Sequence, residues 1–314
     1  MQQRRRSVKR FGSVAMPFLP DSVGVGSIVG EVTSGTGVDA YDRAMAEGAL
    51  MGQVAFVTGG GSGLGAAFAR RLASDGATVV VNDLDATSAA AVAIDVNGDT
   101  AVFDVCDSAA FDAEIDKVVE RHGRLDIVVN NAGIAPPSDS ERVQQMLANQ
   151  MARMEGRFDD MVPPDSTVSL SDGDWDRMIR VHLYGTFHGT RAALRHMTPA
   201  RSGSIVNVSS VLGLRPMAGA VHYATAKAGI IAFTKSVGQE VAPYGVRVNA
   251  VCPGWIDTPL LAPMDPLMMA GIVMQIPRGR LGTAEELAEL VRFLSGPESS
   301  YCNGDVFAAS GGFA

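Results

Sequence analysis

A tyrosine and a lysine stand four residues apart in the segment YATAK, as Tyr223 and Lys227. This spacing is about one helical turn, so both side chains would lie on one face of a helix. A nearby ammonium group stabilises a tyrosinate and lowers the pKa of the phenol from its ordinary value of about 10. A phenol tuned in this way can act as the general acid or base between an alcohol and a carbonyl.

Ser210 ends the apolar segment SIVNVSS, and its hydroxyl could hydrogen-bond the oxygen of a substrate. A serine at the end of a strand is also a common turn residue, so both roles stay open at this point.

A glycine-rich turn lies between an apolar run and a helical pattern in VAFVTGGGSGLGAAFARRLA, residues 54–73. Gly59, Gly63 and Gly65 allow a tight turn and a close approach of the backbone to a pyrophosphate. The unpaired N–H groups and the dipole at the start of the helix favour such an anion. This segment predicts a dinucleotide site, whereas a turn that only packs the helix on the strand is the alternative.

An acidic residue, Asp83, follows the next apolar run at about 20 residues from the glycine turn. A carboxylate there can bind both hydroxyls of an adenosine ribose and would repel the additional phosphate of NADP. The following residues, Leu84 and Asp85, offer no positive charge for that phosphate. We therefore predict NAD as the cofactor, while a cap of a turn is the other possible role of Asp83.

Short apolar runs alternate with longer amphipathic ones from Gln53 onward, and these elements must position the residues above. The expected strands are Val54–Val57, Thr78–Val81, Ala101–Phe103, Ile127–Val129, Ile205–Val208, Val246–Ala250 and Asp305–Ala308. The expected helices are Leu64–Ser74, Ala109–His122, Asp174–Met197, Ala224–Val241 and Ala284–Leu294. Strands rich in Val and Ile without alternation suggest burial on both faces. The alternation predicts an α/β fold with a doubly wound parallel sheet.

The segment 135–171 interrupts this alternation directly after the fourth strand, so we expect an insertion at the rim of the site. Within it an apolar helical stripe recurs at three- and four-residue spacing, formed by Val143, Leu147, Met151 and Met154. The stripe could face a bulky apolar substrate, as could the Leu- and Met-rich segment 259–274. It could equally pack the insertion onto its own subunit or a neighbouring one.

The composition narrows the class of protein. A chain of 314 residues with 46% hydrophobic residues is long enough for a large core. The net charge of −8 disfavours nucleic acid as a partner, and no apolar run is long enough to span a membrane. Three cysteines without CxxC spacing read as reduced thiols of a cytoplasmic protein, with no metal site.

The first fifty residues differ from the rest of the chain. They begin with a basic stretch and continue with Gly, Ser and Val in no regular pattern. An export signal would need a continuous apolar run, which Pro17, Pro20 and Asp21 interrupt. We expect residues 1–50 to be a loose extension, or the product of translation begun upstream of Met51, and residues 51–314 to form the catalytic domain.

Six motifs in this order resemble the short-chain dehydrogenase/reductase family over essentially Met51 to Ala314. They are TGGGSGLG (58–65), Asp83, Asp104-Val105, NNAG (130–133), the set Ser210, Tyr223 and Lys227, and PGWIDTP (253–259). The resemblance implies a seven-stranded Rossmann fold in a single domain and a catalytic Ser–Tyr–Lys set. The phrases VHLYGTFHGTRAALRHM and VVVND are similar to the hydroxyacyl-CoA and hydroxysteroid dehydrogenase branch.

By the same resemblance, residues from six segments would contact the cofactor. These are Gly59, Ser62, Gly63, Leu64, Gly65, Asp83, Asp104, Val105, Asn131, Ala132, Gly133, Tyr223, Lys227, Pro253, Gly254, Ile256 and Thr258. Asn131 would brace the central strand, and Thr258 would reach the nicotinamide amide. The family is usually tetrameric, so a homo-oligomer, either a tetramer or a dimer, is implied.

One position departs from the family pattern, because His182 in VHLYG stands where the family usually has asparagine. That asparagine helps to hold a water that links the catalytic lysine to solvent. A histidine can also donate or accept a proton, and we expect His182 to replace it in the proton path, with a pH profile that shifts near pH 6 to 7 when His182 is changed. A buried, hydrogen-bonded histidine without a catalytic part is the alternative.

Together these residues predict hydride transfer between NAD and a secondary alcohol, on a bulky apolar substrate of the 3-hydroxyacyl thioester or hydroxysteroid type. A non-catalytic NAD-binding sensor of the same fold is the alternative, although a sensor has no need of Ser210, Tyr223 and Lys227 together. An NAD-dependent epimerase or dehydratase shares YxxxK but lacks the NNAG and GRLG…GDVFAASGG segments.

Overall fold

The computed structural model describes residues 48–136, 140–163, 165–262 and 264–314. Most of the extension predicted for residues 1–50 therefore lies outside the described residues. In the described part, no helix is long and apolar enough to cross a membrane.

Seven parallel strands form one sheet in the order β3-β2-β1-β4-β5-β6-β7. The strands are β1 (Val54–Thr58), β2 (Thr78–Asp83), β3 (Asp99–Val102), β4 (Ile127–Asn130), β5 (Gly203–Val208), β6 (Val246–Pro253) and β7 (Val306–Ala309). All seven predicted strands are present, and the doubly wound fold predicted from their alternation is confirmed. The order reverses between β1 and β4, and a ligand site is expected at such a switch point.

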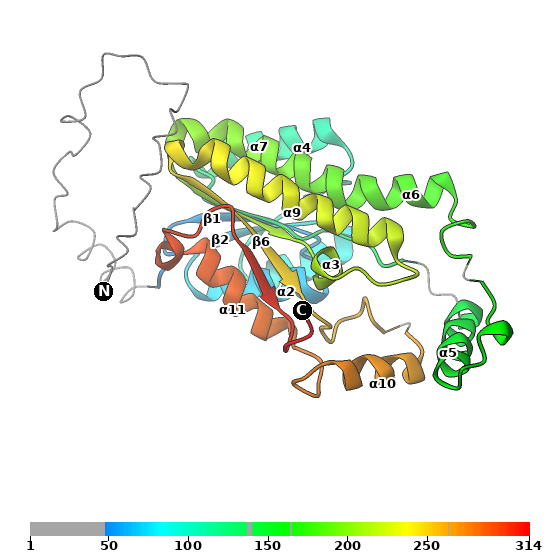
Figure 1. Ribbon diagram of the computed structural model, residues 1–314. Helices are drawn as coiled ribbons and strands as arrows, with labels where there is room; N and C mark the ends of the chain where they lie inside the picture. Colours follow the sequence, from blue (N-terminus) through cyan, green and yellow to red (C-terminus); the bar gives the residue numbers. More distant parts are fainter. Residues whose placement is uncertain (1–47, 137–139, 164, 263) are drawn as a thin grey trace, which may run out of the picture. The chain divides into compact units, whose positions relative to one another are not determined.

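Helices cover both faces of the sheet, with α4, α7 and α9 on one side and α2 and α11 on the other (Figure 1). The longer helices are α2 (Gly63–Ser74), α3 (Ala86–Asp95), α4 (Ser108–His122), α7 (Gly185–Ala200), α9 (Val221–Val241) and α11 (Ala284–Ser295). The others are α5 (Ser140–Met154), α6 (Asp172–Ile179), α8 (Val211–Leu214) and α10 (Pro266–Gln275).

The central strands contribute side chains to two hydrophobic cores, one on each face of the sheet. In β1, Ala55 and Val57 pack with α2, α3 and α11, whereas Val54 and Phe56 pack with α4 and α7. All residues of β1 and β4 are buried, which explains their apolar runs without alternation. The edge strands β3 and β7 are only partly buried, so the prediction of burial on both faces holds for the central strands alone.

The helix predicted over Asp174–Met197 is wrong as a single element. It consists of α6, a π-helical turn at Arg180–Tyr184, and α7. Single π turns within α-helices occur frequently at functional sites. Here the turn contains His182, whose ring is buried.

The domain boundary predicted at Met51 also needs correction. Ala49 and Leu50 are buried, and Leu50 is 0% exposed within the core shared with α2 and α11. The amide of Leu50 donates to the carbonyl of Asp75 at 3.1 Å. The folded part of the chain therefore begins before Met51.

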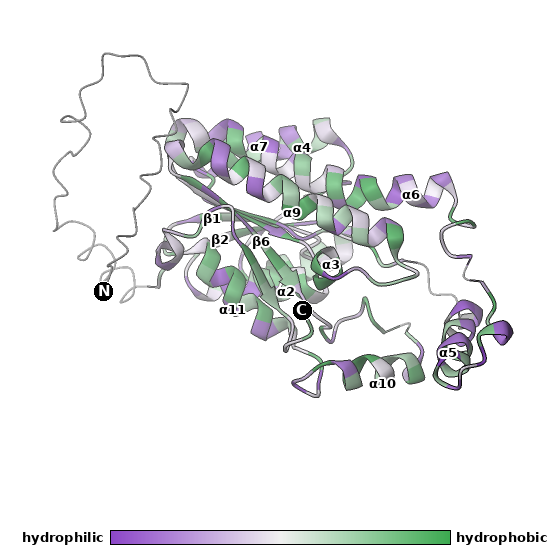
Figure 2. Cartoon of the chain, in the orientation of Figure 1, coloured by the Kyte–Doolittle hydropathy of each residue, from purple (hydrophilic) through white to green (hydrophobic). Residues whose placement is uncertain are grey.

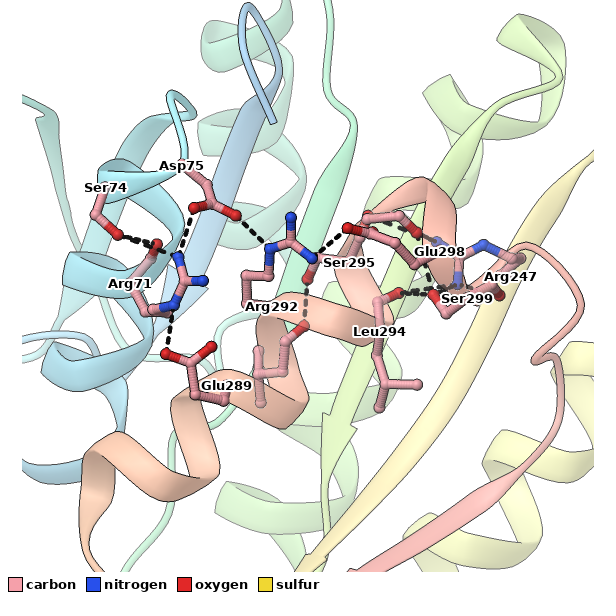
Figure 3. A network of polar contacts seen from close by, with 12 residues as sticks. Arg71, Ser74, Asp75, Arg247, Glu289, Arg292, Leu294, Ser295, Glu298 and Ser299 are labelled. Carbon is pink, nitrogen blue, oxygen red and sulfur yellow. Dashed lines mark hydrogen bonds and ion pairs between the residues drawn. The ribbon is translucent and has the colours of Figure 1, made fainter. Parts of the chain in front are cut away.

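A polar network fastens α2 to α11 on the face opposite α9 (Figure 3). Arg292 of α11 pairs with Asp75, just after α2, and with Glu298. Arg71 of α2 also binds Asp75, at 2.7 Å. Arg247 of β6 donates to main-chain carbonyls at the end of α11 and so satisfies groups that the helix leaves unpaired. This network holds the C-terminal end of α2 against α11.

Candidate active site

A cleft of about 1260 Å³ opens at the carboxyl ends of the strands. All of the residues assigned above to cofactor binding or catalysis line it, with one exception, Gly65. The cleft brings together the turn after β1, the ends of β2 and β4, and the first turns of α8 and α9. Segments as far apart in the sequence as Gly59 and Thr258 thus form one site.

The glycine turn leaves room for a phosphate group. Gly59 and Gly63 have φ angles of +59° and +51°, which other residues rarely adopt. Gly65 supports the turn from behind, because a Cβ atom on it would lie 2.0 Å from the carbonyl oxygen of Gly59. Ser62 stands at the N-cap of α2, and its side chain makes no capping hydrogen bond. Its hydroxyl and the first N–H groups of α2 therefore fit a pyrophosphate.

Asn131 ties the segment after β4 to the end of β1. Its side-chain amide donates to the carbonyls of Thr58 and Gly59, at 3.0 and 3.1 Å. The hydroxyl of Thr58 accepts from the N–H groups of Asn131 and Ala132, at 2.9 and 3.0 Å. These contacts fix the segment after β4 relative to the end of β1.

Asp83 lies at the end of β2 with its carboxylate held in place. One oxygen accepts from the N–H of Gly61 at 3.0 Å, and the other accepts from the N–H of Asp85 at 3.1 Å. A carboxylate has further lone pairs, so these bonds leave capacity for the hydroxyls of a ribose. Both roles considered for Asp83, a turn cap and a ribose acceptor, are thus compatible in this geometry.

Asp104, Val105 and Thr258 complete the part of the cleft that fits a dinucleotide. Asp104 accepts from the N–H of Cys106 at 2.9 Å, and Val105 is buried. Thr258 lies against the glycine turn, since a Cβ on Gly63 would be 3.8 Å from the Cβ of Thr258. The residues around the cleft therefore fit a nicotinamide dinucleotide.

Ser210, Tyr223 and Lys227 also line the cleft. Ser210 caps α8 by accepting from the N–H of Leu212 at 3.1 Å, and its hydroxyl lies close enough to the phenol of Tyr223 to favour the tyrosinate. The Nζ of Lys227 lies 5.6 Å from the centre of the Tyr223 ring. It donates to the carbonyl of Val208 at 2.8 Å. An alcohol or carbonyl oxygen placed here would meet two hydroxyls that can share a proton.

The pKa of Tyr223 is raised, because burial disfavours the tyrosinate more than the hydrogen bond from Ser210 favours it. The expectation that Lys227 lowers the phenol pKa is therefore wrong for the chain by itself. Burial also lowers the pKa of Lys227, to about 7. A lysine that is partly neutral at this pH stabilises a tyrosinate less than a full ammonium would.

His182 lies edge-on to Tyr223, with ring centres 5.3 Å apart and planes at 85°. Its Nε2 is 3.2 Å from the N–H nitrogen and 3.0 Å from the carbonyl oxygen of Ile134, and its Nδ1 has no partner among the described residues. Burial, followed by the charge of Lys227, holds the pKa of His182 well below its usual range. The expected change of its charge near pH 6 to 7 is therefore wrong.

Several buried polar residues behind the site were missed. Asn130 donates to the side-chain oxygen of Asn207 at 2.8 Å, and Asn207 donates to the hydroxyl of Thr234 at 3.0 Å. These hydrogen bonds join β4, β5 and α9. Asparagines inside apolar strands were the available signal, because such residues need buried partners.

The insertion faces the cleft with residues other than those predicted. Arg142 and Met146 of α5 line the cleft, whereas Met151 and Met154 are 58% and 78% exposed. The side chain of Val143 lies outside the described residues. Of the two roles left open for the stripe, the substrate-facing one does not hold for Met151 and Met154, since neither lines the cleft.

The opposite rim of the cleft is apolar. Figure 2 shows that α10 is hydrophobic along most of its length. The apolar residues that line the cleft in and around this region are Met217, Trp255, Leu260, Leu261, Met264 and Met268. The segment 259–274 thus contributes to the rim, where an apolar part of a substrate would fit.

Comparison with known proteins agrees with this geometry. Residues 53–158 match the family described as short chain dehydrogenase, and residues 160–314 match the family described as Enoyl-(Acyl carrier protein) reductase. The 3-oxoacyl-acyl-carrier-protein reductase FabG of Thermotoga maritima is 35% identical over 268 residues, which cover 84% of this chain and 98% of that protein. The protein of the same name from Escherichia coli K12 is 34% identical over 263 residues, with 83% and 97% covered.

The cleft and the sheet define a nucleotide-dependent oxidoreductase. The chain belongs to the short-chain dehydrogenase family, as its motifs predicted. Membership implies a nicotinamide dinucleotide cofactor.

Proposed function

We propose that this protein is an NAD-dependent oxidoreductase that interconverts a secondary alcohol and a ketone on a 3-hydroxyacyl or 3-oxoacyl thioester. One observation carries the proposal: Ser210, Tyr223 and Lys227 line the same cleft as the glycine turn. The relatives named as 3-oxoacyl-acyl-carrier-protein reductases support the thioester over the hydroxysteroid.

When bound, the nicotinamide supplies the acceptor or donor of the hydride. In the direction of oxidation, Tyr223 takes the proton of the substrate hydroxyl as general base, and in reduction it returns the proton. Ser210 donates to the substrate oxygen and orients it toward Tyr223. Lys227, whose Nζ lies 5.6 Å from the centre of the Tyr223 ring, would orient the ribose of the cofactor. His182 keeps the backbone of Ile134 in place beside this set.

NAD is proposed over NADP because of Asp83. Its carboxylate is fixed by two backbone N–H groups at the end of β2, where it would accept from ribose hydroxyls and repel a phosphate. We also propose that the protein is a homo-oligomer, a dimer or a tetramer, in the cytoplasm. The exposed methionines of α5 would suit a contact with a neighbouring copy.

The test is turnover of a 3-hydroxyacyl thioester followed by NADH fluorescence, with wild type and Tyr223→Phe. We expect at least a hundredfold loss of kcat in the variant with unchanged affinity for NAD, because only the proton transfer is removed. The wild type should prefer NAD to NADP. Retention of more than a tenth of the activity would remove Tyr223 from its role. Tight NAD binding without turnover of any alcohol or ketone would favour the sensor.

A further inference from the structure

Two arginines that line the cleft have no acidic partner in the described part of the chain. Arg177 of α6 and Arg180 of the following π turn are three residues apart and both line the cleft. Among the described residues, neither lies within ion-pair distance of a carboxylate. The side-chain neighbour of Arg180 is the thiol of Cys106.

This lack of partners is unusual in this chain. Most other arginines of the described part bind a carboxylate or a main-chain carbonyl. Examples are Arg70, Arg71, Arg121, Arg124, Arg157, Arg195, Arg201, Arg215, Arg247, Arg280 and Arg292. Asp176 lines the same stretch of the cleft but pairs with neither Arg177 nor Arg180. The two guanidinium groups are therefore available to an anion.

The arginines belong to other elements than the pyrophosphate site, and Arg180 lies beside Cys106, which follows the predicted cofactor contacts Asp104 and Val105. The glycine turn and Ser62 already provide for the pyrophosphate of the cofactor at the start of α2. Arg177 and Arg180 come from α6 and the π turn, which follow directly on the insertion that contributes Met146 to the cleft. A ligand that also contacts Tyr223 and the apolar rim would thus carry its anionic group at a second place.

We propose that Arg177 and Arg180 form a phosphate subsite for the carrier of the substrate, the phosphate of a phosphopantetheine thioester. Guanidinium groups bind phosphate oxygens through paired hydrogen bonds, and an apolar acyl group would lie on the rim formed by Trp255 and α10. This inference rests on the proposed function and selects a thioester with a phosphate-bearing carrier, which a steroid lacks.

The experiment compares two thioesters with the same acyl group. One is 3-oxobutanoyl-coenzyme A, which carries phosphates, and the other is the N-acetylcysteamine thioester, which carries none. The Arg177→Gln/Arg180→Gln double variant should raise KM for the coenzyme A thioester at least tenfold, with kcat and the KM for the N-acetylcysteamine thioester unchanged within twofold. Arg153→Gln, which changes an arginine of α5 outside the cleft wall, is the matched control.

Salt provides a second readout. Added salt should raise the wild-type KM for the coenzyme A thioester, and the double variant should have lost this dependence. Equal changes for both thioesters, or none, would overturn the subsite while leaving the proposed function intact. An increased Kd for NAD in the double variant would assign the arginines to the cofactor and would also overturn it. Turnover of neither thioester by the wild type would instead contradict the proposed function.

Discussion

Lys227 carries an ionisable amino group and is almost completely buried. Its side chain is 4% exposed, and Nζ has a carbonyl, not a carboxylate, as its hydrogen-bond partner. Burial without a counter-charge lowers the pKa to about 7 from 10.5. Between these two pH values the unfolded chain binds more protons than the folded chain, so folding stability rises with pH in this window.

We therefore expect the melting temperature of the wild type to rise between pH 7 and pH 10 relative to that of Lys227→Met. The variant should be inactive and should lack this pH-dependent contribution, since it has no proton to lose. Thermal unfolding at several pH values, followed by circular dichroism, measures the difference. Parallel curves for the two proteins would mean that Lys227 keeps an ordinary pKa.

His182 presents a different problem, because one ring nitrogen faces both the N–H and the carbonyl of Ile134. In a neutral imidazole that nitrogen either donates or accepts, so only one of the two groups is satisfied at a time. An asparagine amide offers a donor and an acceptor together. The histidine thus fills the position with less complete hydrogen bonding.

His182→Asn should keep kcat within a few-fold, with a pH profile between pH 5.5 and pH 8 that does not move. The reason is that burial lowers the pKa of His182 well below its usual range, which favours the neutral ring. In His182→Ala, kcat should fall at least tenfold, because the N–H and the carbonyl of Ile134 then lose their contact with the side chain at position 182. A profile that shifts near pH 6 to 7 in the asparagine variant would show that His182 titrates in the working enzyme.

At the scale of elements, the last residues of the described chain connect three segments of the cleft. Phe313 is 4% exposed and packs with Ile272 and Ile276, from α10 and the residue after it. Its ring meets Trp255 edge-on at 6.3 Å and lies under the guanidinium of Arg215 at 5.0 Å. Arg215 donates to the carbonyl of Phe313 at 2.9 Å. It directly follows α8, and Ser210 directly precedes that helix.

Phe313→Ala should destabilise the fold by about 3–5 kcal/mol, the usual range for a buried Phe→Ala change. Because Phe313 supports Trp255 and α10, the KM for a long-chain thioester should rise more than the KM for a short one, with the Kd for NAD unchanged. Phe313→Leu should recover most of both losses. Destabilisation with equal KM changes for the two chain lengths would limit Phe313 to a packing role.

At the scale of the whole molecule, the folded part starts earlier than the first recognisable motif. Leu50 fills a place in the core shared by α2 and α11, although it precedes the strand that carries the glycine turn. Nothing in the local pattern around Leu50 marks it as buried, because it belongs to no helix or strand.

Deletion of residues 1–47 should leave stability unchanged, whereas deletion of residues 1–50 should cost about 2–5 kcal/mol, as expected for the loss of a buried leucine. Leu50→Ala in the full chain is the matched control and should reproduce most of the cost. Urea unfolding of the three proteins measures the free energies. Equal stability of the two deletions would contradict the burial of Leu50.

The sequence was sufficient for features that depend on neighbouring residues. The strand, glycine turn and helix around Gly59 follow from local conformational preferences. The pairing of Tyr223 with Lys227 depends only on helical spacing. The apolar runs suffice for a parallel sheet because those of the central strands are buried on both faces. The helices α3 and α10 were missed because their residues show no clear hydrophobic period.

Only the tertiary structure decided features that depend on burial between distant segments. The raised pKa of Tyr223 and the lowered pKa of Lys227 arise because α9 packs into the interior. The contact of His182 with Ile134 joins a π turn to the segment after β4. Arg177 lines the cleft and Met151 does not, and this difference depends on the path of the chain after the insertion. Desolvation and long-range contacts are sums over the whole fold, so no short segment of sequence contains them.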